Sequence, residues 1–273
     1  MRCNKLRALL TSGKPTIGTH LFLDSPAVVE AIGQSQAFDY VEFLAEYAPF
    51  DLTALENFCR AAELYDLGTM IKVDYEEHRY VAQRAIGAGF QSVLFADARS
   101  PQDVVHFVKS VRADCPGSDG FHGVAIRRNT MPNYGSSPAY VTALDEIVVA
   151  VMIEKAPALE ALEKILEVRG IDMIQWGPAD YAMSIGKPGE GGSPAVRAVE
   201  RRVIEMCIQA GVPPRAEIST PEEASYYMEL GVRHFCLGYD LFTLQRVLGQ
   251  DGEKLRTLVD AYSDTTAMRE PEP

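Results

Sequence analysis

The sequence predicts a single (β/α)8 barrel. Eight short apolar runs alternate along the chain with longer segments whose apolar residues recur at three- and four-residue spacing. The chain has 273 residues, a length typical of one such barrel. Helix start and stop signals also fall where this alternation requires them.

The apolar runs are rich in β-branched residues, which favour strands. In chain order, the predicted strands are 16–21, 39–44, 69–73, 91–95, 148–153, 172–176, 214–218 and 234–237. The segments between them predict helices at 27–35, 52–64, 77–88, 100–111, 156–167, 194–210 and 221–230.

A cap residue followed by proline precedes four of these helices, which is a frequent helix start. The pairs are Ser25-Pro26, Ser100-Pro101, Ser193-Pro194 and Thr220-Pro221. Glycines end the helices ahead of the next strand, at Gly68, Gly89, Gly170, Gly211 and Gly231. An open doubly wound sheet is the alternative fold, but no GxGxxG motif follows the first strand.

No linker divides the chain, so we expect residues 1–262 to form one barrel domain. Residues 114–143 form the one large insertion, between the fourth helix and the fifth strand. Residues 263–273 are expected to be a flexible C-terminal tail.

Composition narrows the classes of partner. The chain has 38 acidic and 26 basic residues, and its net charge of −12 disfavours binding to nucleic acid or anionic membranes. No apolar run approaches the length of a membrane span, and the N-terminus has no signal-peptide core. Five scattered cysteines without a CxxC pair indicate reduced thiols and a cytoplasmic location.

Two carboxylates follow neighbouring predicted strands. Glu154 ends the run VVAVMIE, and Asp180 follows the segment WGPAD. Barrel enzymes build their sites at these strand ends, and paired carboxylates suit a hard cation such as Mg²⁺ or Mn²⁺. Alternatively, Glu154 pairs with Lys155 or a barrel arginine, and Asp180 caps the turn after Gly177-Pro178.

Lys72 stands in the apolar setting of the third strand. It could neutralise an anionic substrate or a developing oxyanion, or form a Schiff base. Alternatively, Glu42 or Glu46 on the adjacent strand pairs with it. Residues 177–192 form a glycine-bearing loop whose amides could receive a carboxylate.

Other residues point to the substrate's outer end. Arg127 and Arg128 lie with Tyr134 in the insertion, which could close over an acidic substrate as a lid or form an oligomer contact. Trp176 suggests contact with an acidic or aromatic group, and His20 lies near the end of the first strand. The sequence lacks the GxSxG and HExxH motifs of common hydrolases.

These motifs resemble the HpcH/HpaI aldolase family, metal-dependent class II aldolases of 2-oxo acids. The most specific segments are VMIE at 151–154, VRGID at 168–172 and WGPADYAMSIG at 176–186. The resemblance continues at FDY (38–40), AIGAGF (85–90), YG (134–135), LGVRHF (230–235) and GYD (238–240).

The resemblance implies a (β/α)8 barrel that forms homo-oligomers: dimers exchanging the last helix, and hexamers built from them. It implies that Glu154 and Asp180 hold a divalent metal, Mg²⁺ or Mn²⁺ with Co²⁺ as an alternative, which binds a pyruvate-like 2-oxo acid. The amides of Ala179 and Asp180 would contact the substrate carboxylate. Lys72 falls where relatives commonly have an arginine beside the 2-oxygen.

The site departs from the family pattern at its acid/base dyad. The family usually reads Asp-x-Glu-His after the second strand, whereas this chain has Leu44 and Tyr47 around a retained Glu46. Met152 also replaces a frequent glutamine, and Lys72 lacks the planar fork of arginine.

Strand parity offers a replacement for the dyad. Glu42 lies two residues before Leu44, so both side chains should face the same side of the strand. Glu42 could form a proton-transfer pair with Tyr47 or His20; alternatively, it only pairs with Lys72.

The sequence therefore predicts a divalent-metal-dependent carbon–carbon lyase acting on a pyruvate-like 2-oxo acid through an enolate. Two alternatives remain open. The altered dyad could mark another enolate reaction, condensation or decarboxylation, or it could mark an inactive protein that binds metal and oxo acid.

Overall fold

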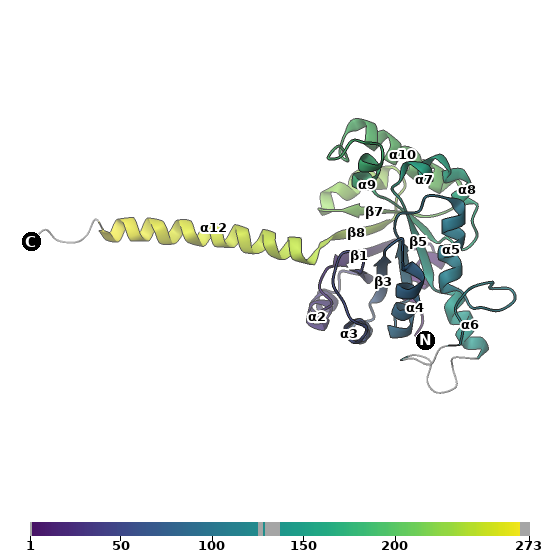
Figure 1. Ribbon diagram of the computed structural model, residues 1–273. Coiled ribbons are helices and arrows are strands. Elements are labelled where there is room, and N and C mark those ends of the chain that lie inside the picture. The colour runs from purple at the N-terminus through teal and green to yellow at the C-terminus, as the bar shows by residue number, and fades with distance from the viewer. Residues whose placement is uncertain (1, 125–127, 129–136, 268–273) are drawn as a thin grey trace, which may run out of the picture.

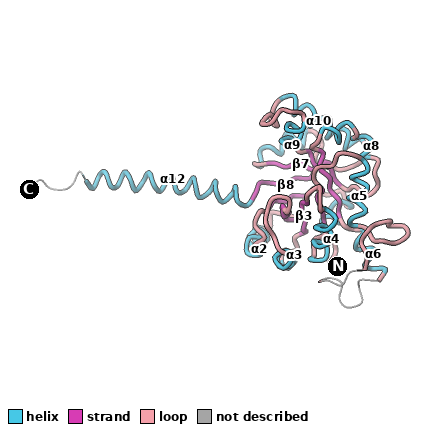
Figure 2. Tube along the Cα trace, in the orientation of Figure 1, coloured by secondary structure: helices cyan, strands magenta, loops and turns pink. Residues whose placement is uncertain are grey.

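The predicted barrel is confirmed: eight parallel strands pair in chain order and close on themselves. The computed structural model describes residues 2–124, 128 and 137–267. Helices surround the strands as an outer layer (Figures 1 and 2). The strands are β1 (Thr16–Leu21), β2 (Tyr40–Leu44), β3 (Gly68–Val73), β4 (Ser92–Phe95), β5 (Val148–Ile153), β6 (Met173–Trp176), β7 (Pro214–Ile218) and β8 (His234–Tyr239).

Helices follow the strands, and α2, α5, α10 and one 3-10 turn start at the predicted cap residues. The Ser100 hydroxyl accepts the Asp103 amide, and the Asp103 carboxylate accepts the Ser100 amide, which satisfies two free helix-end donors. The helices are α1 (Lys5–Thr11), α2 (Pro26–Ser35), α3 (Leu52–Leu64), α4 (His78–Ala88), α5 (Pro101–Val111), α6 (Pro138–Asp145), α7 (Ala156–Glu160), α8 (Leu162–Leu166), α9 (Pro178–Ser184), α10 (Pro194–Gln209), α11 (Ala224–Glu229) and α12 (Asp240–Ala267), with a 3-10 turn at Pro221–Glu223.

Several predicted elements differ in detail. The helix expected at 156–167 is two helices, because Ala161 leaves the helical conformation at φ −97° and ψ 8°. The helix expected at 221–230 starts as a 3-10 turn. The loop expected at 177–192 contains α9, whose first turn carries Asp180.

The longest helix, α12, was not predicted. Its first residue, Asp240, accepts the backbone amides of Phe22 and Leu23 at 3.0 Å, which anchors the helix beside β1. It then projects away from the barrel (Figure 1). The helix extends through Ala267, so the first part of the predicted flexible tail is helical. Residues 268–273 lie outside the described residues, and the predicted domain division stays a prediction.

Two kinds of side chain fill the inside of the barrel. Apolar residues occupy the amino-terminal half on β3 to β6, where α1 adds Leu6; they include Met70, Leu94 and Met173. Polar residues occupy β1, β2 and β7. Gly18 is required here because a Cβ would overlap the ring of Tyr40, whose hydroxyl accepts from Arg215 inside the barrel. The polar side of the barrel leads toward the strand ends, where the candidate site lies.

None of the helices in the described part of the chain is long and apolar enough to cross a membrane.

Candidate active site

A cavity of about 240 Å³ lies at the carboxyl ends of the strands. Eight of the nine predicted site residues line it: His20, Glu42, Tyr47, Lys72, Glu154, Trp176, Ala179 and Asp180. The ninth, Arg127, lies outside the described residues, as does Tyr134. The structure therefore brings residues from both ends of the sequence to one place.

Three carboxylates converge from consecutive strand ends, and two of them, Glu154 and Asp180, line this cavity. Asp97 follows β4, Glu154 follows β5, and Asp180 lies after β6 in the first turn of α9. One oxygen of each lies within 4.8 Å of the other two. Asp97 was not predicted as a ligand, although its place directly after a buried strand was visible in the sequence.

Glu154 is almost fully buried, at 2% exposure. Burial raises the pKa of its carboxyl to about 7; Asp180 and Asp97 contribute to the rise, whereas Lys72 and the amide of Asp97 oppose it. The Asp97 amide donates to Glu154 Oε1 at 2.8 Å and fixes its direction. The positive charge near Glu154 is therefore too small to offset the burial of its ionised carboxylate.

Lys155 lies between the other two carboxylates. Its Nζ is 2.7 Å from Asp97 Oδ1 and 2.7 Å from Asp180 Oδ1. The suggested pairing of Lys155 with Glu154 is thus wrong: strand alternation turns consecutive side chains apart, and Lys155 reaches the flanking aspartates instead.

These residues fit a divalent metal ion. They offer three carboxylate oxygens, the ligand type that hard cations prefer. Next to them, Gly177 lacks a side chain, and a Cβ there would overlap the Glu154 carboxylate. A glycine at position 177 is therefore required for the Glu154 carboxylate to take this position.

Lys72 lies across the cavity with two partners. Its Nζ is 2.6 Å from Glu46 Oε2 and donates to the Tyr47 hydroxyl at 2.6 Å. Burial alone would lower the pKa of Lys72, but Tyr47, Glu46 and Glu154 raise it above its usual range. Lys72 therefore keeps its positive charge.

Burial raises the pKa of Tyr47 to about 12, although Lys72 lowers it in part. A phenol with this pKa keeps its proton at neutral pH and is a poor base. The predicted catalytic role of Tyr47 stays a prediction; in this environment it would orient Lys72 or donate a hydrogen bond.

Glu42 does face the interior, as strand parity indicated, but its partner is Arg215 rather than Lys72. Both side chains are fully buried and form an ion pair. Arg215 also donates to Gln175 Oε1 and, at 2.7 Å, to the Tyr40 hydroxyl. The alternative that Glu42 pairs with Lys72 is therefore wrong, because the buried guanidinium of Arg215 requires this carboxylate.

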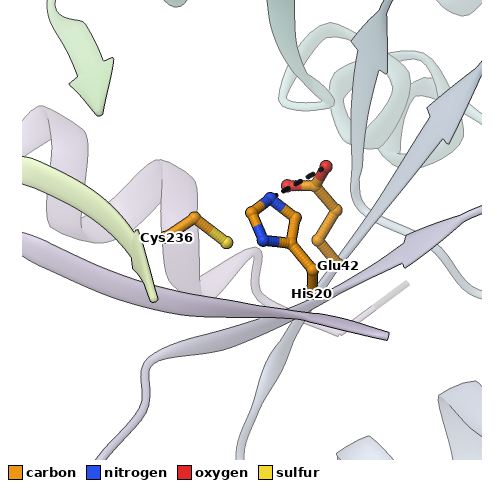
Figure 3. Close-up of side chains that lie close together, drawn as sticks. All are labelled: His20, Glu42 and Cys236. Atoms are coloured by element: carbon orange, nitrogen blue, oxygen red, sulfur yellow. Dashed lines mark ion pairs between the residues drawn. The ribbon is translucent and has the colours of Figure 1, made fainter. Parts of the chain in front are cut away.

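His20 stands beside Glu42 inside the barrel (Figure 3). Its Nδ1 lies 3.0 Å from the Gly238 carbonyl, which can only accept, so this nitrogen carries a proton. Its Nε2 lies 3.9 Å from Glu42 Oε1 and 3.8 Å from Glu217 Oε2. The predicted neighbourhood of His20 and Glu42 is therefore present, with Glu217 as a second carboxylate.

Figure 3 also shows Cys236 near His20 and Glu42. These three side chains place potential ligand atoms within 4.8 Å of one another. However, Arg215 already supplies a buried positive charge to Glu42. A second cation here would meet that charge at close range, which disfavours a metal.

Glu217, on β7, was missed by the sequence analysis. The Tyr239 hydroxyl donates to its Oε1, and Gln175 Nε2 donates to its Oε2 at 3.1 Å. Burial raises the pKa of Glu217, but His20, Tyr239, Arg215 and Lys72 together lower it below its usual value. Its side chain remains 36% exposed, whereas that of Glu42 is not exposed.

Trp176 packs against Tyr181, with ring centres 4.8 Å apart. Its buried indole nitrogen makes no hydrogen bond to a described residue. Ala179 lies in the first turn of α9, next to Asp180. Contact of Trp176 and Ala179 with substrate stays a prediction.

The position of Arg128 contradicts the prediction that it lies in a lid over the substrate. Its guanidinium donates to the Ala88 carbonyl at 3.0 Å and pairs with Glu63 at 2.5 Å. Ala88 ends α4, which leads into the start of β4, so Arg128 lies at the barrel face opposite the cavity.

Comparison with known proteins decides the family. The sequence profile of the HpcH/HpaI aldolase/citrate lyase family matches residues 17–246. The chain belongs to this family. The predicted family and its enzyme class, aldolase-type lyases, are therefore confirmed.

Individual HpcH/HpaI proteins are similar over almost the whole chain. A hydroxypyruvate/pyruvate aldolase of Paraburkholderia phytofirmans is 27% identical over 93% of this chain and 98% of its own length. A 4-hydroxy-2-oxo-heptane-1,7-dioate aldolase of Shigella flexneri is 27% identical over 89% of this chain and 90% of its own. A family member of solved structure from Burkholderia cenocepacia is 29% identical, with a TM-score of 0.84 over 93% of this chain and 99% of its own.

Proposed function

We propose that this chain cleaves or forms a carbon–carbon bond to a pyruvate-like 2-oxo acid, through an enolate and with a divalent metal. The observation that carries the proposal is the convergence of the Asp97, Glu154 and Asp180 carboxylates at a cavity that Glu154, Asp180 and the charged Lys72 line. The names of the two aldolase relatives, which describe 2-oxo acids, support the substrate class.

In this proposal Glu154 and Asp180 hold the metal, with Asp97 as a third ligand. The ion is Mg²⁺ or Mn²⁺, with Co²⁺ as an alternative, because all three ligands are carboxylates. When bound, it acts as a Lewis acid that stabilises negative charge on the 2-oxygen of the substrate. Lys72 supplies a second positive charge from across the cavity.

The substrate carboxylate would bind the amides of Ala179 and Asp180 at the start of α9. Trp176 and Arg127 are the proposed contacts of the substrate's outer end. During cleavage, the 4-hydroxyl loses its proton, the C3–C4 bond breaks, and the enolate is protonated at C3 to give pyruvate.

Pyruvate release tests this function. The protein is incubated with 4-hydroxy-2-oxo acids of different chain length, with Mn²⁺ or with excess EDTA, and pyruvate is measured by a coupled assay. We expect release that requires metal. If no substrate in the series releases pyruvate with metal bound, the proposal is wrong.

A different enolate reaction remains a second candidate. The observation that favours it is the loss of acid/base groups at Leu44 and Tyr47, since decarboxylation needs no base for a 4-hydroxyl. Release of carbon dioxide from oxaloacetate, faster than the cleavage of any 4-hydroxy-2-oxo acid, would favour this reaction.

Borohydride treatment with pyruvate should not trap a Schiff base on Lys72. Its partners Glu46 and Tyr47 keep the amine protonated, and a protonated amine is not a nucleophile. Mass spectrometry of the intact protein is the readout, and an adduct that disappears in Lys72→Met would reverse the assignment.

Replacing Lys155 with methionine should tighten metal binding. The Lys155 ammonium occupies the space between Asp97 and Asp180, so a bound cation must displace it or bind beside it. Removing the positive charge of Lys155 from the neighbourhood of the metal ion should raise the affinity for Mn²⁺ about tenfold. Calorimetric titration with Mn²⁺ measures it; weaker binding in Lys155→Met would show that Lys155 instead positions the ligands.

We further propose a homo-oligomer, either a dimer or a hexamer built from dimers, in the manner of the family. The projecting helix α12 supports this, because it exposes apolar side chains that a partner copy could cover. They are Leu241, Phe242, Leu244, Val247, Leu248, Leu255, Leu258 and Val259. A cytoplasmic location stays a prediction, in keeping with the five free cysteines.

A further inference from the structure

We propose that Glu217, assisted by His20, is the proton-transfer residue of this site and replaces the acid/base dyad that the chain lacks. The inference rests on the proposed function. It concerns residues that no relative's name or motif assigns. It follows from a polar cluster inside the barrel, which consists of His20 on β1, Glu42 on β2, Arg215 and Glu217 on β7, and Tyr239 on β8.

Strand register places Glu217 across from the metal ligand Glu154. Met152 pairs with Gln175 of β6, and Gln175 pairs with Arg215 of β7. Two residues further along each chain lie Glu154, Gly177 and Glu217, at the same height of the barrel wall. Gly177, between them, has no side chain, and the Glu154 side chain occupies the space that a Cβ would fill. Both glutamates line the same cavity.

The other carboxylates around the cavity already have strong partners. Glu42 is fully buried against Arg215, and Glu46 pairs with Lys72. Asp97 and Asp180 share Lys155. Among the described residues, the hydrogen bonds that Glu217 accepts come from neutral groups, Tyr239 and Gln175, and its side chain is 36% exposed. Glu217 is therefore accessible from the cavity, and its lowered pKa keeps it in the ionised form that can take a proton.

The neighbours of Glu217 orient it for this task. Burial raises the pKa of Tyr239, so its hydroxyl stays protonated and holds Oε1 as a donor. His20 directs Nε2 toward Oε2 at 3.8 Å, since the Gly238 carbonyl fixes Nδ1. Separations of this kind commonly shorten when substrate binds.

The proton balance closes within the site. Glu217 takes the proton of the substrate's 4-hydroxyl while the C3–C4 bond breaks, and the bond's electron pair becomes the enolate. C4 becomes the carbonyl of the released aldehyde or ketone. The same proton then returns, directly or through His20 Nε2, to C3 of the enolate and forms the methyl group of pyruvate. No external reagent is consumed.

Glu217→Gln tests the proposal, because glutamine keeps the shape but cannot take the proton. We expect pyruvate release and methyl exchange of pyruvate in D₂O to fall at least about 100-fold. Mn²⁺ affinity should stay within about twofold of wild type, and Glu217→Asp should restore part of the rate. The control is Glu163→Gln, because Glu163 is an exposed carboxylate on α8 that does not line the cavity.

Three outcomes would overturn the inference. Wild-type rates in Glu217→Gln would remove Glu217 from proton transfer and leave the proposed function intact. A loss of Mn²⁺ affinity equal to the loss of rate would assign Glu217 to the metal site. A wild-type protein that neither releases pyruvate nor exchanges its methyl protons would reject both the inference and the function.

Discussion

Glu154→Gln and Asp180→Asn should each lower Mn²⁺ affinity by more than about 100-fold and abolish metal-dependent pyruvate release. Loss of a hydrogen-bond partner of a metal ligand typically lowers metal affinity or activity by about 10–100-fold. These two substitutions change a ligand itself, so we expect a larger effect. Both substitutions keep the side-chain shape, so the barrel should still fold. Because Glu154 is buried without a close positive partner, its neutral variant should be at least as stable as wild type without metal.

Calorimetric titration and chemical unfolding measure the two effects separately. Glu163→Gln is the control, since Glu163 is an exposed carboxylate on α8, away from the cavity. Asp97→Asn should show a smaller loss of affinity, because the proposed metal pair, Glu154 and Asp180, remains intact. Unchanged affinity in both Glu154→Gln and Asp180→Asn would reject the metal assignment.

Glu42→Gln should lower the free energy of unfolding by about 3–5 kcal/mol. The change leaves the guanidinium of Arg215 fully buried without its opposite charge. Urea unfolding followed by circular dichroism measures the loss. The double variant Glu42→Leu, Arg215→Met should recover most of it, because removing both charges removes the desolvation cost.

Comparing variants of Glu42 and Glu217 separates effects on stability from effects on catalysis in the polar cluster. Glu42 and Glu217 both face His20 and both line the cavity, but Glu42 is fully buried against Arg215, whereas the Glu217 side chain is 36% exposed. Glu42→Gln should therefore act mainly on stability, and Glu217→Gln mainly on rate. A stable Glu42→Gln that has lost activity would instead support the earlier prediction that Glu42 transfers the proton.

The sequence predicted the barrel because each strand is an apolar run between clear helix signals. The strands β1, β5 and β7 have the predicted bounds, and Glu154 and Asp180 were found because each follows such a strand. Helix α12 was missed although its sequence carried a signal: Leu241, Leu244 and Leu248 recur at three- and four-residue spacing.

The polar cluster was only half predictable. Parity along β2 identified Glu42 as an inward residue, but its partner lies 173 positions away, and local spacing cannot reveal such a pair. A signal did exist in β7, where PRAEI puts Arg215 and Glu217 at alternate positions of a buried strand. Charges on the inward face of a barrel strand require partners, so Arg215 and Glu217 indicate a polar site by the same argument as Glu154.

Deuterium exchange into the methyl group of pyruvate tests the central claim most directly. The exchange needs a metal, a 2-oxo-acid site and a working base, but no knowledge of the second substrate. We expect proton NMR to show exchange with Mg²⁺, none with EDTA, and none in Asp180→Asn. Exchange that persists at the same rate in EDTA and in Asp180→Asn would contradict a metal-assisted enolate.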